Sequence, residues 1–300
     1  MDTKDRFRGC LLGLAVGDAV GTTLEFKSPG SFEPISDMVG GGPFNLKPGE
    51  WTDDTSMALC LATSLLETGG FDPKDQMDRY CRWWKDGYLS SNGRCFDIGN
   101  TVTAALNQYQ KTGDPIAGST SPHSAGNGSI MRLAPLPTFY YPDLATAVHY
   151  SAESSRTTHG APECIDACRL LAGIICRAFS GASKEHILFG DAASFRGEPK
   201  ITGIAQGKYR NKPIGEIRGS GYVVESLEAA LWCFLHAETF EAAILKAANL
   251  GEDADTTAAI CGQVAGAFYG ESGIPKKWLD RLAMREEISA LANRLLETNH

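Results

Sequence analysis

The sequence has few strand signals, no linker and no long uninterrupted apolar run. No Pro/Ser-rich, low-complexity or like-charged block divides its 300 residues, and no period of roughly 20–50 residues repeats along it. We therefore predict a single domain over residues 1–300. The apolar segment near the N-terminus is interrupted by Asp18, too soon for a membrane span, and it is not typical of a secretory signal.

Basic side chains are in the minority. The chain has 36 acidic residues against 28 lysines and arginines, a net charge of −8. Sequence-independent capture of nucleic acid relies on clustered Lys and Arg, so no nucleic-acid partner is expected. A phosphate-bearing ligand would have to be held by backbone amides or bound metal. Coiled-coil heptads are also missing, and a monomer is the expected state.

The nine cysteines are an odd number, and most lie in apolar helical context. Buried free thiols are typical of a reducing compartment, so we expect a cytoplasmic protein without membrane attachment. Cys164 and Cys168 lie four positions apart near His159, which raises a zinc site as an alternative. With three soft ligands and no second pair of suitable spacing, packing is the favoured interpretation.

Apolar residues recur at three- and four-residue spacing through most of the chain, which predicts an all-α, compact multi-helix fold. Thr239 is the expected cap of one helix, and Gly251 its expected end. Glycine-rich loops separate the helices, and each brings bare backbone to a helix start, as binding of polar ligands requires, although each alone is also compatible with an ordinary turn. The predicted helices cover residues 6–16, 55–68, 161–180, 222–237, 241–250 and 285–299, and the loops cover 40–51, 121–132 and 215–222.

Two helix starts carry more acids and hydroxyls than capping needs, in WTDDTSM (51–57) and GEDADTT (251–257). One Asp, Ser or Thr satisfies a helix start. If the two turns meet, four carboxylates come within a few ångströms, and cations must neutralise their repulsion. An all-oxygen ligand set suits Mg²⁺ or Mn²⁺, and four acids suit two ions. The alternative is two over-supplied N-caps. The candidate ligands are Thr52, Asp53, Asp54, Asp253, Asp255 and Thr256.

Six segments in a fixed order resemble the ADP-ribosylglycohydrolase family, most closely its dinitrogenase-reductase-activating bacterial branch. They are GDAVGTTLEF (17–26), WTDDTSM (51–57), DIGN (97–100), GNGSIMR (126–132), the His159 of SSRTTHG, and GEDADTTAAICGQVAGAFYG (251–270). The resemblance covers nearly the whole chain. It implies an orthogonal all-α fold with two adjacent Mg²⁺ or Mn²⁺ ions at the base of a cleft, and hydrolysis of the bond joining ADP-ribose to a protein side chain.

The resemblance also implies roles for individual residues. The six candidate ligands match the metal ligands of the family. Asp97 matches the acid assigned to catalysis, and Glu25 matches a glutamate that approaches the metals from a mobile flap. The positions that match those holding the ribose, diphosphate and adenine are Asn100, Gly126, Asn127, Gly128, Ser129, His159 and Tyr222.

Several of these residues have ordinary alternatives. Asp97 is compatible with a turn residue that caps the following helix, Glu25 with a surface position, and Tyr222 with core packing. His159 is compatible with a surface or capping histidine. Three further residues are expected to have structural roles: Asp18 turns the chain and caps backbone near the site, and Trp83 and Trp84 pack into the core.

Glu252 departs from the family pattern, which more often has glycine there. Its side chain must either point away from the metals or add a charge beside them.

The leading hypothesis is an enzyme that removes mono-ADP-ribose from protein, with arginine as the expected linkage, an ADP-ribosylated protein as substrate and ADP-ribose as product. Serine-linked ADP-ribose and O-acetyl-ADP-ribose are alternative substrates. A catalytically silent ADP-ribose-binding protein is a rival of another class, which the crowded acids disfavour. A dinuclear phosphoesterase is a third, but histidines would be expected among its metal ligands.

Overall fold

The computed structural model describes residues 2–298, and within them the only regular secondary structure is helical, with three isolated β-bridges. This confirms the all-α prediction. The α-helices are α1 (Thr3–Gly21), α2 (Asp53–Thr68), α3 (Pro73–Asp86), α4 (Asn100–Thr112), α5 (Pro135–Tyr140), α6 (Leu144–Arg156), α7 (Pro162–Phe179), α8 (Lys184–Phe189), α9 (Pro199–Ala205), α10 (Val223–Leu235), α11 (Phe240–Ala248), α12 (Ala254–Tyr269), α13 (Lys276–Leu279) and α14 (Arg285–Glu297), and short 3-10 turns include η1 (Thr22–Leu24).

Among the described helices, α1 and α12 form the most extensive pair. They run antiparallel, with small residues facing each other every four positions. A methyl group at Gly13 would lie 2.3 Å from the carbonyl oxygen of Gly262, and one at Gly17 would lie 2.2 Å from that of Ala258. Only glycine permits this approach of two backbones. The four facing pairs are Gly9 with Gly266, Gly13 with Gly262, Gly17 with Ala258, and Gly21 with Ala254.

This pairing explains why α1 is longer than predicted. The segment GDAVG was expected to turn the chain, but it forms the last turns of α1. Gly17 and Gly21 face α12 from inside the helix, so their role is close packing rather than a change of chain direction.

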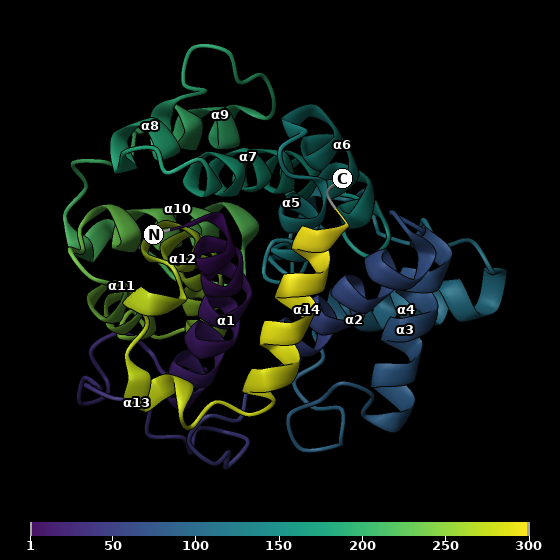
Figure 1. Cartoon of the computed structure of the whole chain (residues 1–300), viewed down its shortest axis with the longest axis horizontal. Coiled ribbons are helices and arrows are strands. Elements are labelled where there is room, and N and C mark those ends of the chain that lie inside the picture. Colours follow the sequence, from purple (N-terminus) through teal and green to yellow (C-terminus); the bar gives the residue numbers. More distant parts are fainter. Residues whose placement is uncertain (1, 299–300) are drawn as a thin grey trace.

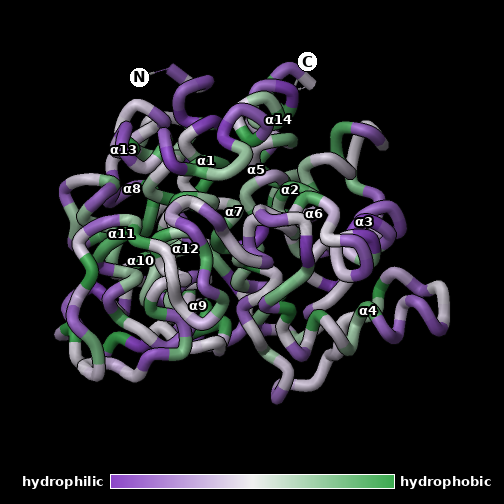
Figure 2. Tube along the Cα trace, turned by 90° about the horizontal axis from the view of Figure 1, so that it is seen from below, coloured by the Kyte–Doolittle hydropathy of each residue, from purple (hydrophilic) through white to green (hydrophobic). Residues whose placement is uncertain are grey.

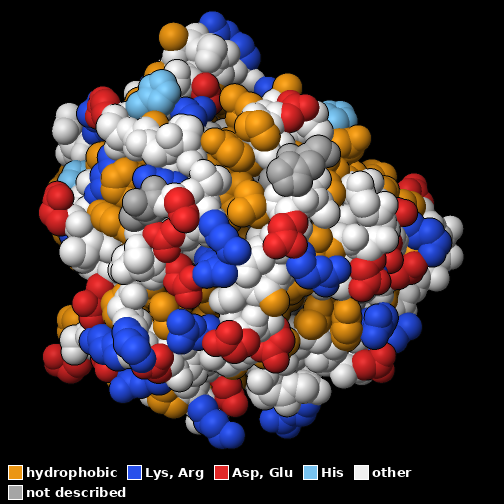
Figure 3. All heavy atoms as spheres, in the orientation of Figure 1, with side chains coloured by type: hydrophobic (Ala, Val, Ile, Leu, Met, Phe, Trp, Pro, Cys, Tyr) orange, Lys and Arg blue, Asp and Glu red, His pale blue; other side chains and the backbone are white. Residues whose placement is uncertain are grey.

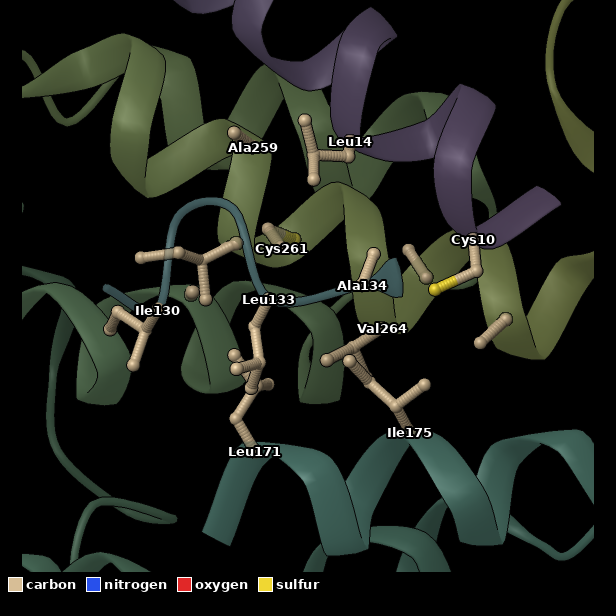
Figure 4. Packing of buried hydrophobic residues seen from close by; sticks show 14 of the residues in the cluster. Cys10, Leu14, Ile130, Leu133, Ala134, Leu171, Ile175, Ala259, Cys261 and Val264 are labelled. Carbon is tan, nitrogen blue, oxygen red and sulfur yellow. The ribbon is translucent and has the colours of Figure 1, made fainter. Parts of the chain in front are cut away.

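The main apolar core lies on both sides of α12. Figure 4 shows Leu14 and Cys10 of α1 on one side of it, and Leu171 and Ile175 of α7 on the other, with the segment around Leu133 between them. In Figure 1, α1 and α14 stand upright while α7 and α10 lie across them, which matches the expected orthogonal arrangement. The start of α12 is therefore fixed by neighbours on several faces.

A second apolar cluster joins α2, α3 and α4, which form one side of the molecule in Figure 1. Trp83 is fully buried there and Trp84 packs against it half-buried, as the core prediction required. Because this cluster includes Met57 of α2 and Met131, it fixes α2 against the loop that precedes α5. That the two clusters belong to a single domain stays a prediction.

The end of α11 also differs from the prediction. Thr239 caps α11 as expected, since its hydroxyl accepts a hydrogen bond from a first-turn amide at 3.1 Å. The helix ends at Ala248 instead of Gly251. The Asn249 side chain exchanges two hydrogen bonds with the backbone of Ile35, at 2.8 and 2.9 Å, and so holds the chain out of the helix.

The surface is polar and mixed in charge. Hydrophobic segments run through the interior of the trace and hydrophilic ones around its edge (Figure 2). On the face drawn in Figure 3, acidic and basic side chains are interspersed without a broad area of one sign. Among the described helices, none combines the length and the hydropathy that crossing a membrane requires.

Candidate functional site

The two acidic helix starts meet in the fold. We call residues 52–55, at the start of α2, the first acidic turn, and residues 253–257, at the start of α12, the second. The Thr52 hydroxyl lies 3.3 Å from a carboxylate oxygen of Asp255, and the Thr256 hydroxyl lies 3.4 Å from one of Asp54. Side chains about two hundred positions apart therefore share one buried polar cluster.

Neither N-cap residue caps its own helix, since the side chains of Thr52 and Asp253 make no capping hydrogen bond. Within the second turn, one acid accepts a helix-start amide: Asp255 accepts from the amide of Thr256 at 2.7 Å. Other helix-start amides find acceptors elsewhere in the chain. Capping therefore does not account for the excess of acids, and the alternative of over-supplied N-caps fails.

Asp18 of α1 supports the first acidic turn. One of its carboxylate oxygens accepts from the amide and hydroxyl of Thr52 at 2.8 and 2.9 Å. The other accepts from the amide and hydroxyl of Thr55 at 3.0 and 2.6 Å. All four donors are buried, so Asp18 fixes the position and direction of this helix start. The prediction that Asp18 caps backbone near the site is thus confirmed.

Glu25, which follows η1, supports the second acidic turn. Its side chain is buried, and one carboxylate oxygen accepts from the amides of Ala254 at 2.7 Å and Asp255 at 3.4 Å. The surface alternative for Glu25 is therefore wrong. On the other side, the amide of Asp253 donates to the carbonyl of Gly219 at 2.8 Å.

Crowding and burial act together on the acids. Burial, followed by the charge of Asp255, raises the pKa of Asp253 to about 7 and has the same effect on Asp18. The pKa values of Asp53 and Asp54 are raised well above their ordinary value by burial and by the neighbouring carboxylates. Such a cluster is costly for the protein alone and favourable for a cation.

Two sets of carboxylate oxygens lie close enough to hold a metal ion. One set comes from Asp18, Asp54 and Asp255, and the other from Glu25, Asp253 and Asp255, each within 4.8 Å. One oxygen of Asp54 is buried and has no hydrogen-bond partner. An unpartnered buried carboxylate oxygen in an all-oxygen set fits a hard divalent cation. The carboxylate cluster is therefore able to hold metal.

A cavity of about 470 Å³ opens directly over this cluster. Asp97 enters it from the loop before α4 with φ +60, and it makes no capping bond to that helix, so its interpretation as a turn cap is wrong. Burial, followed by the charge of Asp255, raises the pKa of Asp97 to about 11. The lining residues include Glu25, Asp53, Asp97, Asn100, Gly126, Asn127, Gly128, His159, Asp253, Asp255 and Thr256.

The glycine-rich loop 125–129 contributes Gly126, Asn127 and Gly128 to the cavity wall. A methyl group at Gly128 would lie 2.7 Å from the His159 ring, so the loop needs glycine there to pass that ring. His159 is buried rather than superficial, and burial lowers its pKa to about 3, which keeps the imidazole neutral. The side-chain amide of Asn127 donates to Asp253 at 3.0 Å and thus positions a cluster acid.

Comparison with known proteins explains this arrangement. The sequence profile of the ADP-ribosylglycohydrolase family matches residues 1–300. The chain belongs to this family. It is 48% identical over 293 residues to "ADP-ribosylarginine hydrolase Tri1" of Pseudomonas putida (strain GB-1), covering 98% of this chain and 78% of that protein.

Two further ADP-ribosylglycohydrolases support the assignment. The chain is 34% identical over 292 residues to "ADP-ribosyl-[dinitrogen reductase] glycohydrolase" of Rhodospirillum rubrum, covering 94% of this chain and 92% of that protein. A solved structure described as "ADP-ribosylglycohydrolase-related protein complex" superposes with a TM-score of 0.88 at 43% identity and covers 100% of this chain and 99% of that one. The family resemblance seen in the sequence motifs is confirmed.

Two residues that match substrate contacts of ADP-ribosylglycohydrolases do not line the acidic cavity. Ser129 is buried, where it accepts the Cys168 thiol at 3.4 Å. Tyr222 lines a neighbouring cavity of about 550 Å³, and its hydroxyl donates to Glu163 at 2.5 Å and accepts from Lys200 at 2.7 Å. Tyr222 is partly buried and packs against the main core, as its ordinary alternative expected, while its hydroxyl faces the neighbouring cavity.

The departure from the family pattern at Glu252 leaves the site intact. Glu252 adopts φ +59 and forms an ion pair with Arg218, away from the carboxylate cluster. The zinc alternative also fails on geometry. Cys164 donates to the carbonyl of Gly126 at 3.2 Å, and the two grouped carboxylate sets are the metal-compatible clusters found among the described residues.

The full part played by Asp18 was not visible in the sequence. Its one signal was a lone acid inside the apolar stretch 9–21, which carries glycine every four positions. An acid in such a place is buried and must have partners. The partners lie 34 and 37 positions along the chain, and the sequence gives no means of pairing them.

Proposed function

We propose that the protein is a metal-dependent hydrolase that removes mono-ADP-ribose from arginine side chains of modified proteins. One observation carries the proposal: both acidic turns, Glu25 and Asp97 converge on a single cavity of about 470 Å³, a size usual for small-molecule sites. The names of the Pseudomonas putida and Rhodospirillum rubrum relatives supply the reaction class and, for the former, the arginine linkage.

We propose that the carboxylate cluster holds two Mg²⁺ or Mn²⁺ ions. Two carboxylate sets that share Asp255, and an unpartnered oxygen on Asp54, favour two adjacent ions over one. When bound, such ions fix ribose hydroxyls and make a water more nucleophilic. The proposed ligands are Thr52, Asp53, Asp54, Asp253, Asp255 and Thr256.

Glu25 and Asp97 are the proposed proton-transfer groups. In the reaction, a water oxygen bonds to the anomeric carbon while the bond from that carbon to the arginine nitrogen breaks. The water loses a proton and the departing nitrogen gains one, so the site needs a carboxylate that accepts and a carboxyl group that donates. Glu25 and Asp97 are acids that enter the cavity from loops outside the two turns.

Substrate recognition is proposed for the cavity wall. The amides of Gly126 and Asn127 already donate to the carbonyls of Ser124 and Gly221, so these two residues would act as wall residues of the cavity. The Gly128 amide, beside the neutral His159, is the proposed backbone donor to a diphosphate. Asn100, in the first turn of α4, faces the same space. Ser129 would act by holding this loop. Tyr222, which follows the cavity-lining Gly221, would flank the adenine end from the neighbouring cavity.

The test is release of free ADP-ribose from an arginine-ADP-ribosylated protein, with Mg²⁺, Mn²⁺ or a chelator, beside the same assay on a serine-linked substrate. We expect metal-dependent release from arginine and a large loss in Asp97→Asn. Release from serine alone would overturn the linkage. Binding of ADP-ribose without release from either substrate would replace the proposal with a silent binding protein, and absence of binding would favour a phosphoesterase.

The cellular compartment, the partner and the oligomeric state of the enzyme are also proposals. All nine cysteines are free in the structure, which suits the reducing cytoplasm. We propose that the partner is an ADP-ribosylated protein and that the enzyme is a monomer. Light scattering behind a sizing column tests the latter, and a mass of about twice the 32.2 kDa of the chain would contradict it.

A further inference from the structure

Phe26 stands out among the apolar side chains of the described residues. It is 67% exposed, more than any other large hydrophobic residue there, and the others that reach exposure are aliphatic. It also lines the acidic cavity, next to Glu25 in the chain. The Phe26 ring is thus both exposed to solvent and part of the cavity wall, which places it at the edge of the cavity mouth.

The backbone holds Phe26 in this place at a cost. Its φ is +62, a left-handed conformation that is unfavourable for a bulky residue. Two reciprocal hydrogen bonds impose it, from the Phe26 amide to the Glu252 carbonyl and from the Glu252 amide to the Lys27 carbonyl, each at 2.7 Å. An exposed ring with a strained backbone adds nothing to stability, and such strain is typical of functional positions.

Phe26 is the open end of a row of three aromatic rings. Its centroid lies 6.3 Å from that of Phe44 in an edge-on contact, and Phe44 lies 5.3 Å from Phe96. Phe96 precedes Asp97 in the chain. The row therefore joins the two loops that carry the proposed proton-transfer acids, and Phe44 limits how far the Phe26 ring can turn.

The face of an aromatic ring is complementary to a planar cation. Phe26 presents such a ring in the cavity wall, outside the residues proposed to hold the ions. A guanidinium group stacks well on an aromatic ring, and the attraction is worth about 0.5–2 kcal/mol depending on desolvation. A serine linkage presents a neutral oxygen and no such group.

We propose that Phe26 is a specificity-determining residue that packs the face of its ring against the guanidinium group of ADP-ribosyl-arginine at the cavity mouth. This inference rests on the proposed function. It assigns the choice of leaving group to a residue outside the metal cluster, and it leaves recognition of the ADP-ribose part unchanged.

Phe26→Leu tests the inference, because leucine keeps apolar bulk and removes the ring. We expect kcat/KM on an arginine-ADP-ribosylated peptide to fall about 3- to 30-fold, which corresponds to the cation–π range above. The Kd for free ADP-ribose, which has no guanidinium group, should stay within twofold. Phe26→Tyr should restore most of the activity, and Phe71→Leu, a matched change at a half-buried ring that contacts Tyr150, should leave kcat/KM unchanged.

The outcomes separate the inference from the function on which it rests. If the unmodified enzyme releases nothing from the arginine-linked peptide, the proposed function itself fails, and the inference with it. If the enzyme is active but Phe26→Leu stays within twofold of it, the ring does not contact the guanidinium. An equal loss in kcat/KM and in affinity for ADP-ribose, or no recovery in Phe26→Tyr, would show a general effect on the cavity and overturn the inference.

Discussion

The two acidic turns are alike in sequence but are held in different ways. The first is supported by Asp18, which lies inside the long helix α1 and accepts four buried hydrogen bonds. The second is supported by Glu25, which follows a short turn and lies next to the exposed Phe26. In both, an acid from elsewhere in the chain caps the helix. The acids of a helix start stay available to bind a metal when a residue from elsewhere accepts hydrogen bonds from the helix-start amides.

The two supports differ in their position relative to the cavity rather than in how firmly they hold the turns. Asp18 lies inside α1 and does not line the cavity, whereas Glu25 lines it beside Phe26. Both turns are held by the packed helices, because Gly21 at the end of α1 meets Ala254 in the second turn. A substrate in the cavity therefore reaches the support of the second turn directly, and that of the first only through the turn.

The largest expected effect comes from removing one acid from either turn. Asp54→Ala and Asp255→Ala should each lower kcat/KM by about 10³-fold or more, since each loses metal-based stabilisation of several kcal/mol. Titration calorimetry should show weakened Mg²⁺ binding in both. Asp72→Ala is the control, because Asp72 is an ordinary acidic N-cap of α3, and it should lower stability by about 1 kcal/mol without loss of activity. Full activity in either cluster variant would mean that one turn alone makes the site.

The next effect is the dependence of stability on pH and metal. The folded-state pKa values of Asp18 and Asp253 are raised to about 7, so the stability linked to their protonation is complete below about pH 4 and is lost as pH rises to about 7. Mg²⁺ offsets this loss, by about 2.7 kcal/mol at a hundred times its Kd. The gain in melting temperature on adding Mg²⁺ should therefore grow between about pH 4 and pH 7.

The gain should be measured at each pH as the melting temperature with Mg²⁺ minus the melting temperature of the metal-free protein. His159 acts in the opposite sense, because its pKa is lowered to about 3, and the metal-free protein loses stability as pH falls below about 6.5. Subtracting the metal-free melting temperature removes that contribution. A gain that is equal at pH 5 and pH 8 would contradict a cluster that exchanges protons for metal.

A smaller effect is expected from the pair α1 and α12, which carries Asp18 and the second acidic turn. Gly13→Ala should lower the free energy of unfolding by about 3 kcal/mol or more, because the added methyl group meets rigid backbone at 2.3 Å. Urea denaturation measures it. Gly215→Ala is the control, since no atom lies within 4 Å of its added methyl group. If Gly13→Ala is as stable as the control, the close approach of α1 and α12 is not what fixes the turns.

The sequence supported the all-α fold and the candidate ligands because those signals are local. An excess of Asp and Thr at a helix start is visible in a window of seven residues, and apolar spacing marks the helices. The sequence did not indicate which residues hold the two acidic turns in place. Asp18 and Glu25 cap helices 34 and 229 positions away, and such partners depend on how helices cross.

The same limit applies to the single residues that were interpreted wrongly. GDAVG has the composition of a turn, and only contact with α12 makes its glycines helical. Glu25 stands among small and apolar residues, which fits a surface position as well as a buried one. For Phe26 no prediction was possible, because neither its left-handed backbone nor its exposure has a signature in the sequence.

The smallest expected effect tests the support of the first turn alone. Thr55→Val removes one of the four donors to Asp18, a bond of 2.6 Å, and leaves the other three in place. A hydrogen bond to a charged group contributes about 1.5–3 kcal/mol, and the remaining donors and the valine methyl group offset part of it, so the expected loss is about 1 kcal/mol in urea denaturation. Thr63→Val, in the same helix, is the control, because the Thr63 hydroxyl donates to the carbonyl of Leu59 and to no acid. Equal losses in the two variants would mean that Asp18 does not fix the first turn, and the contrast between the two supports would then disappear.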